Sequence, residues 1–106
     1  MRKRTRPPLH PGQILRLHYL EPLELSVVQV ATALQVSRKT VSKILHGRGA
    51  ITPAMALKLA QAFRTTPELW LNLQRTYDLW HAAQHPAAWQ QIPALVPVSA
   101  SPAALS

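Results

Sequence analysis

The sequence predicts an all-α fold in which five short helices form one small domain. Apolar residues recur at helical spacing in five consecutive segments, and each segment opens on a recognisable helix start signal. No segment alternates apolar and polar residues over a useful length, so no strand is expected. With 106 residues, 47% of them apolar, the chain can form one hydrophobic core but is too short for two domains.

The first two helices are expected on either side of a proline break. The first begins at Pro11, a position that a first helical turn accepts, and its apolar face ends where Pro22 interrupts it. The second opens at Ser26, which forms a capping-box pattern with Gln29 three residues later. Its inward positions are Val27, Val30, Ala31 and Leu34. The connection at residues 35–36 separates it from the next helix.

The third helix is expected to begin after the cap Ser37 and to end at Gly47 and Gly49. Its inward residues are Val41, Ile44 and Leu45, while the other face is basic and polar. The fourth and fifth helices open alike, with Thr followed by Pro at 52–53 and 66–67. The fifth is expected to run to about residue 84.

Three stretches of different composition predict the domain organisation. Residues 1–9 are expected to form a basic arm that contains Arg2, Lys3, Arg4 and Arg6. Two alternatives remain for this arm: it inserts into a DNA groove, or it is disordered. Residues 10–84 form the helical domain. Residues 85–106 are a tail rich in Pro, Ala and Ser, in which Trp89 and Ile92 remain candidates for packing back on the body.

The charge balance favours a polyanionic partner. Twelve Lys and Arg against four acids give a formal net charge of +8, which points first to nucleic acid and second to an anionic membrane surface. The basic N-terminus is not followed by an apolar segment, so export is not expected, and no window has the roughly 18 apolar residues of a spanning helix. A cytoplasmic protein is expected.

The second and third predicted helices form a DNA-binding helix-turn-helix pattern. Two short helices are joined by about three residues, and the second carries a basic outer face, with no acid between residues 27 and 66. The N-terminal part of the second helix enters the major groove in such motifs, which places Arg38, Lys39, Ser42 and Lys43 nearest the base edges. Ser37, Thr40 and Arg48 are expected to contact phosphates. The alternative is a merely solvated basic face.

The fifth helix carries a broad apolar stripe that is expected to form a subunit interface. The residues assigned to this interface are Leu69, Trp70, Leu73, Tyr77 and Trp80. Such a stripe is wider than one narrow core contact needs, and its aromatic content fits an interface core. The alternative is that the whole stripe packs on the first and fourth helices.

Five segments resemble the HigA and VapI antitoxins, a branch of the Cro/repressor-like (XRE) helix-turn-helix proteins. The segments are HPGQIL at 10–15, LEPL at 20–23, VSRKTVSKILHGRGAIT at 36–52, MALKLAQAF at 55–63 and TPELWLNLQRTYDL at 66–79. The resemblance implies a five-helix domain that dimerises, binds operator DNA to repress its own operon, and neutralises a HigB-type ribonuclease toxin. The toxin-binding surface is not indicated by the residue pattern.

The sequence departs from this family at two turns. Gln35 stands where the family commonly has Gly between the two helices, and Arg64 stands where Gly often follows the fourth helix. A left-handed backbone at either position would cost a residue other than Gly roughly 1 kcal/mol. We therefore expect either strained turns or turns of another kind, and neither affects the recognition surface.

The sequence offers no catalytic or metal constellation, so neither an enzyme nor a cofactor is expected. There is no Cys, the four acids are not paired with His, and no Gly-rich phosphate loop is present. His81 and His85 have the spacing of zinc ligands on a helix, but Ala82 stands where a metalloprotease helix has Glu. The remaining alternatives are a solitary repressor without a toxin and a protein-interaction or RNA-binding module. The outer face of the third helix has no aromatic residue for base stacking, which favours duplex DNA.

Overall fold

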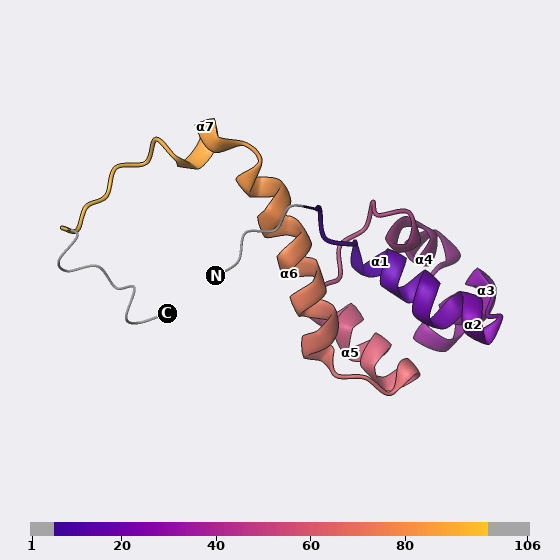
Figure 1. Cartoon of the computed structure of the whole chain (residues 1–106). Coiled ribbons are helices and arrows are strands. Elements are labelled where there is room, and N and C mark those ends of the chain that lie inside the picture. Colours follow the sequence, from indigo (N-terminus) through magenta and orange to yellow (C-terminus); the bar gives the residue numbers. More distant parts are fainter. Residues whose placement is uncertain (1–5, 98–106) are drawn as a thin grey trace.

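The computed structural model describes residues 6–97, and all regular structure in this range is helical (Figure 1). The elements are α1 (Pro11–Leu15), η1 (Arg16–Leu20), α2 (Glu21–Leu23), α3 (Val27–Leu34), α4 (Arg38–Leu45), α5 (Pro53–Phe63), α6 (Pro67–Ala83) and α7 (Pro86–Trp89). Because α1, η1 and α2 follow one another without a break, they form the first helix of the body. The predicted all-α fold is confirmed.

The helix starts lie at the predicted caps. Ser26 Oγ accepts a hydrogen bond from the Gln29 N–H at 3.1 Å, and Gln29 Oε1 accepts one from the Ser26 N–H at 2.8 Å, so the capping box is formed. The side chains of Ser37, Thr52 and Thr66 each accept from a backbone N–H three residues on. These bonds satisfy amide donors that have no partner within the helix.

The prediction that Pro22 ends the first helix is wrong. The helix runs through Pro22 to Leu23, because residues 16–20 adopt a π-helical turn with hydrogen bonds from residue i+5 to residue i. The N–H of Glu21, for example, donates to the carbonyl of Arg16. Pro22 lacks an N–H, and its ring would collide with the carbonyl of residue 18 in a regular α-helix. The wider π turn accommodates that ring.

Three turns contain a left-handed residue that is not glycine. Glu24, Gln35 and Arg64 have φ angles of 53°, 58° and 54°. Of the two alternatives for the turns at Gln35 and Arg64, the structure therefore has strained turns, with a left-handed backbone at positions where the family commonly has Gly. By contrast, the turn after α4 places Gly47 at φ 73°, where the lack of a Cβ removes the strain.

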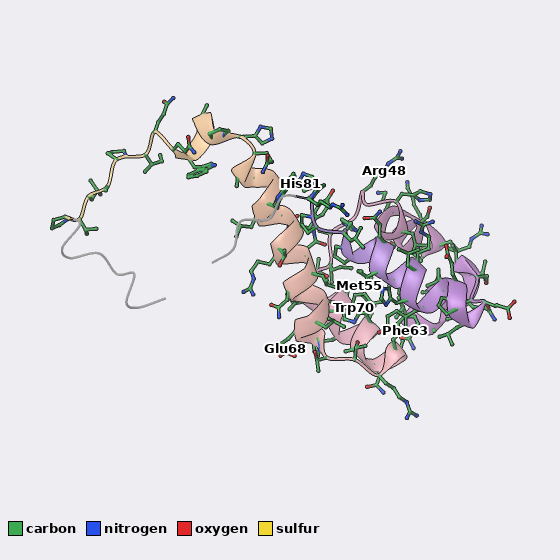
Figure 2. All side chains as sticks on the ribbon, viewed as in Figure 1. Arg48, Met55, Phe63, Glu68, Trp70 and His81 are labelled. Atoms are coloured by element: carbon green, nitrogen blue, oxygen red, sulfur yellow. The ribbon has the colours of Figure 1, made fainter. Side chains whose placement is uncertain are left out.

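The core lies between all five helices of the body. Its buried members are Leu15, Leu20, Val30, Ala31, Leu34, Val41, Ile44, Ile51, Met55, Ala56, Leu59 and Trp70. Trp70 is fully buried, and its indole N–H donates to Thr65 Oγ1 at 2.7 Å, so the polar atom of the large ring has a partner. Figure 2 shows Met55 and Trp70 pointing toward the interior from α5 and α6.

Helix α6 is connected to the loop after α4 by a buried amide. Gln74 Oε1 accepts a hydrogen bond from the backbone N–H of Ile51 at 2.8 Å, and Gln74 Nε2 donates to Asp78 Oδ1 at 3.0 Å. Because Gln74 is buried, these bonds satisfy polar groups that would otherwise be costly to remove from water. The C-terminal half of α6 extends beyond the other helices (Figure 1).

Between residues 84 and 97, the described part of the segment after α6 does not pack on the body. Residues 86–89 form the single turn α7, and Trp89 and Ile92 are 48% and 71% exposed. Figure 1 shows this segment leading away from the helical body. The alternative that these two side chains anchor the tail is therefore wrong.

His10 caps the first helix and is buried. Its Nδ1 accepts from the N–H of Gly12 at 2.9 Å, while Gln13 Oε1 accepts from the N–H of His10 at 3.0 Å, which completes a second capping box. Burial lowers the pKa of His10 below its ordinary value of 6.5, although the charge of Asp78 and a hydrogen bond to the backbone of Gly49 act in the opposite direction. The fold therefore favours the neutral ring, whose Nδ1 can accept.

The strained turns generate a prediction about stability. Replacing Gln35 or Arg64 by Gly is expected to raise the free energy of unfolding by about 0.5 kcal/mol at each position, because relief of left-handed strain exceeds the entropy that Gly loses on folding. Urea denaturation of each variant measures this change. Gln35→Ala is the control: it keeps the Cβ and should give no gain. Equal stability of the Gly and Ala variants would contradict the explanation.

The burial of His10 predicts a loss of stability in acid. Because its folded pKa lies below 6.5, His10 stabilises the fold fully above about pH 6.5, and this contribution is lost as the pH falls through the folded pKa. The free energy of unfolding of His10→Asn, which keeps a capping acceptor, should fall less between pH 7.5 and pH 5 than that of the parent protein. His18→Asn, at an exposed position, should behave like the parent.

Candidate nucleic-acid interface

The two faces of α4 have opposite chemistry. Val41 and Ile44 are buried against the rest of the body, where α4 contacts α1 and α3. The side chains of Arg38, Lys39 and Lys43 are exposed on the other face. Since the core residues fix which way the helix faces, the three cations are presented together to solvent, as the sequence predicted.

Ser37 and Thr40 lie together at the start of α4. Ser37 Oγ accepts from the N–H of Thr40 at 3.1 Å, and its hydroxyl lies 2.9 Å from Thr40 Oγ1. Ser37 is exposed, whereas Thr40 is half-buried. Both hydroxyls retain lone pairs or protons for a further bond, and they lie at the helix N-terminus, where the backbone dipole favours an anion. Their predicted contact with phosphate is compatible with this arrangement.

Ser42 and His46 interact at the other end of the same helix. His46 Nδ1 lies 2.8 Å from the carbonyl oxygen of Ser42 and 3.4 Å from its hydroxyl. A neutral His46 ring therefore donates from Nδ1 to this carbonyl, which also accepts the backbone N–H of His46 at 3.0 Å. Ser42 is half-buried, so among the residues assigned to base edges it is less accessible than Arg38, Lys39 and Lys43.

Arg48 continues the basic surface past the end of α4. Its side chain is exposed and points away from the body in Figure 2. Within residues 6–97 the structure contains one ion pair, between Arg16 and Glu21 at 3.6 Å, and it lies on the first helix. The cations of α4 and its loop therefore have no acidic partner within the described chain, and their charge is available to an external anion.

A shallow depression borders this surface, and sequence analysis missed part of it. It is lined by Ser26, Val27, Val28, Arg38, Lys39 and Ser42. Val28 is half exposed beside the two cations, although it is apolar. The signal was present in the sequence, because Val28 falls outside the helical stripe formed by residues 27, 30, 31 and 34. An exposed methyl-bearing side chain at this place can contact the methyl group of thymine.

The apolar stripe of α6 divides between the core and the surface. Trp70 is fully buried in its own chain, so its assignment to a subunit interface is wrong: its helical position turns it inward against the core. Tyr77 is half-buried with its ring edge-to-face against His10, at a centroid distance of 4.8 Å. Leu69 is 38% exposed, and Leu73 and Trp80 are half-buried. These three, with the half-buried Tyr77, are the part of the stripe that a single chain leaves at least partly exposed.

A groove runs along α6 at this surface. It is lined by Pro8, Leu9, Ile14, Leu69, Asn72, Leu73 and Thr76, so the segment before α1 forms one wall and α6 the other. Leu9 is 46% exposed and Leu69 38%. The groove extends the apolar stripe toward the N-terminal arm, which sequence analysis did not predict.

Other candidate chemistry is not assembled in residues 6–97. Within this range, no group of three potential metal-ligating side chains comes together. His81 instead stacks on Tyr77, with ring centroids 4.3 Å apart, and His85 precedes α7. The described helices also lack one that is long and apolar enough to cross a membrane.

The fold and the basic outer face of α4 define a helix-turn-helix protein. The family model for this motif, described as "Helix-turn-helix", matches residues 18–70. The chain is 47% identical over 87 residues to an uncharacterised HTH-type transcriptional regulator of Haemophilus influenzae, which covers 82% of this chain and 80% of that protein. It is 44% identical over 80 residues to the antitoxin HigA-1 of Vibrio cholerae, covering 76% and 75% respectively.

A solved structure extends the similarity to the fold. The Pseudomonas aeruginosa antitoxin HigA with the higBA promoter superposes with a TM-score of 0.78 at 35% identity, covering 86% of this chain and all of that one. The chain belongs to the HigA-type antitoxin family of helix-turn-helix proteins.

Proposed function

We propose that the protein is a sequence-specific operator-binding antitoxin that represses its own operon as a dimer. The observation that carries this proposal is the row of exposed cations on α4, which has no acidic partner in the described chain while the opposite face is buried in the core. A rigid helix with one basic face fits the major groove of duplex DNA. Membership of the HigA-type family supports the same function, since a HigA relative is solved with promoter DNA.

In this proposal the residues of α4 have two roles. Arg38, Lys39 and Lys43 read base edges, with Ser42 contributing from its half-buried position. Ser37, Thr40 and Arg48 contact phosphates and fix the orientation of the helix. The arm of residues 1–9 adds charge near the DNA; residues 1–5 lie outside the described range, and Arg6 is exposed. No catalytic step, cofactor or metal is part of this function.

A dimer is proposed through the exposed part of the α6 stripe. Leu69, Leu73, Tyr77 and Trp80 are at least partly exposed in a single chain and form an apolar face, of which Leu69 and Leu73 also line the groove. Two copies related by a twofold axis would each bury this face against the other. The proposed domain of residues 10–84 then carries both DNA binding and assembly; of the tail expected at residues 85–106, residues 98–106 lie outside the described range.

The second proposed activity is neutralisation of a toxin. Support comes from the family, whose members include the antitoxin HigA-1. We propose a HigB-type ribonuclease as the partner and the cytoplasm as the compartment in which both act. Co-expression with the adjacent open reading frame tests this role: the protein should relieve growth arrest caused by that product. Absence of such a gene would leave a solitary repressor.

The DNA interface predicts the effect of single substitutions. Arg38→Ala and Lys43→Ala are each expected to weaken binding to the operator, located by footprinting on its own promoter, by about 1 to 3 kcal/mol, because each removes one base contact. Lys58→Ala removes an exposed cation from α5 and is the matched control, with little expected effect. If Arg38→Ala and Lys43→Ala keep full operator affinity and an unchanged helical signal, another face binds DNA.

The affinity of the parent protein for the operator should also fall as the salt concentration rises. A plot of the logarithm of the binding constant against the logarithm of the salt concentration should have a slope of roughly −5 for six phosphate contacts.

The dimer predicts a separate effect on assembly. Leu69→Asp combined with Leu73→Asp should split the dimer, because the buried carboxylates would face each other without partners. The monomer should keep its helical signal but lose operator binding, because it reaches only one half-site. Sedimentation measures the assembly. Leu79→Asp, at a position 68% exposed on the same helix, is the control that should stay dimeric. A folded double variant that still sediments as a dimer would contradict this interface.

A further inference from the structure

The segment His10–Pro11–Gly12 touches both α4, the proposed recognition helix, and α6, although it contributes nothing to the basic surface. All three residues are buried. They begin α1, which packs against α4 and α6. These three residues therefore link α4, the helix proposed to face DNA, to α6, the helix that carries the proposed dimer contact.

Gly12 sets how closely α1 approaches α4. A Cβ at this position would overlap the carbonyl oxygen of Ile44 and would lie 2.6 Å from its carbonyl carbon. Both are backbone atoms in the last turn of the recognition helix, so no side-chain rotation can relieve the overlap. The absence of a side chain at Gly12 is thus required for the observed position of α4 against α1.

His10 connects the end of the recognition helix to α6. One edge of its ring meets Tyr77 of α6 at a centroid distance of 4.8 Å and an interplanar angle of 85°. A Cβ on Gly47 would come within 3.8 Å of the ring, so the ring lies against the backbone of that residue. Gly47 and Gly49 form the turn that ends α4, so one imidazole contacts both elements.

Gln74 holds the same loop from a second point. Its amide oxygen accepts from the N–H of Ile51, four residues after Gly47 along the loop. The loop that follows the recognition helix is thus fixed to α6 through two polar side chains, His10 and Gln74, both buried. Movement of α4 relative to α6 would break contacts at both points.

We propose that His10–Pro11–Gly12 is a positioning element that fixes the recognition helix relative to α6, and so sets the distance between the two half-sites that the dimer reads. The inference rests on the proposed function as an operator-binding dimer. In such a dimer the two copies of α6 lie at the symmetry axis, and each α4 is placed relative to α6 through α1 and the loop that follows α4. A looser link lets the two recognition helices move apart or together, so that operators of different spacing are bound with similar affinity.

The test compares operators in which the spacer between half-sites is native, one base pair longer or one base pair shorter. One base pair shifts the second half-site by roughly 3.4 Å and about a tenth of a turn. The parent dimer is expected to bind the altered operators at least tenfold more weakly than the native one. His10→Asn keeps a preferred helix-capping side chain but removes the ring that contacts Tyr77 and the Gly47–Gly49 turn. It should lower this ratio to threefold or less and weaken native-operator binding by about tenfold.

Gly12→Ala is the second variant, because it disturbs the contact of α1 with α4 without touching the basic surface or the proposed interface, and it should flatten the spacing preference similarly. His18→Asn, at an exposed position on the first helix, is the control that should retain the parent ratio. Folded, dimeric His10→Asn and Gly12→Ala with the parent ratio would overturn the proposal. Loss of the helical signal in both would also overturn it, because the segment would then serve only overall stability. Failure of the parent protein to bind its promoter would instead overturn the proposed function.

Discussion

The close approach of α1 to α4 at Gly12 is the constraint on which the presentation of the basic surface depends. At this point the backbone of one helix rests on the last carbonyl groups of the other, with no side chain between them. The approach brings Leu15 into the same core as Val41 and Ile44, so these two residues on the inner face of α4 are buried. The outer face then has only one orientation available, which exposes Arg38 and Lys43 together.

Local signals in the sequence were enough to predict where the helices begin. The starts of α3, α4, α5 and α6 each depend on a side chain within three residues of the amide that it satisfies, as at Ser26 and Ser37, so the information is contained in a short window. The same holds for the exposed cations of α4, whose position follows from the apolar stripe on the other side of one short helix. The fold class and the exposed cationic face of α4 were therefore accessible without a structure.

The errors and omissions came from interactions that no short window contains. Proline normally ends a helix, so Pro22 predicts a helix end. The π turn that accommodates Pro22 is not visible in the spacing of apolar residues, so the sequence does not predict that the helix continues. Trp70 was assigned to an interface because its place in the stripe does not say whether the neighbouring surface belongs to the same chain. The hydrogen bond between Gln74 and Ile51 joins positions 23 residues apart. The spacing of residues in the sequence predicts neither the burial of Gln74 nor this bond.

Helix α6 combines closure of the core with the surface proposed for assembly, and this shared use has a physical consequence. Its inner side holds Trp70 and Gln74, while Leu69 on another side is open to a partner. The charged residues of α6 all lie at or before Asp78. The cations proposed to contact DNA lie on a different element, α4 and its loop. Added salt screens the contact to phosphate but strengthens or leaves unchanged the burial of apolar surface. The proposed assembly and the proposed DNA contact are therefore expected to respond differently to the solvent, even though the same packed helices would set the geometry of both.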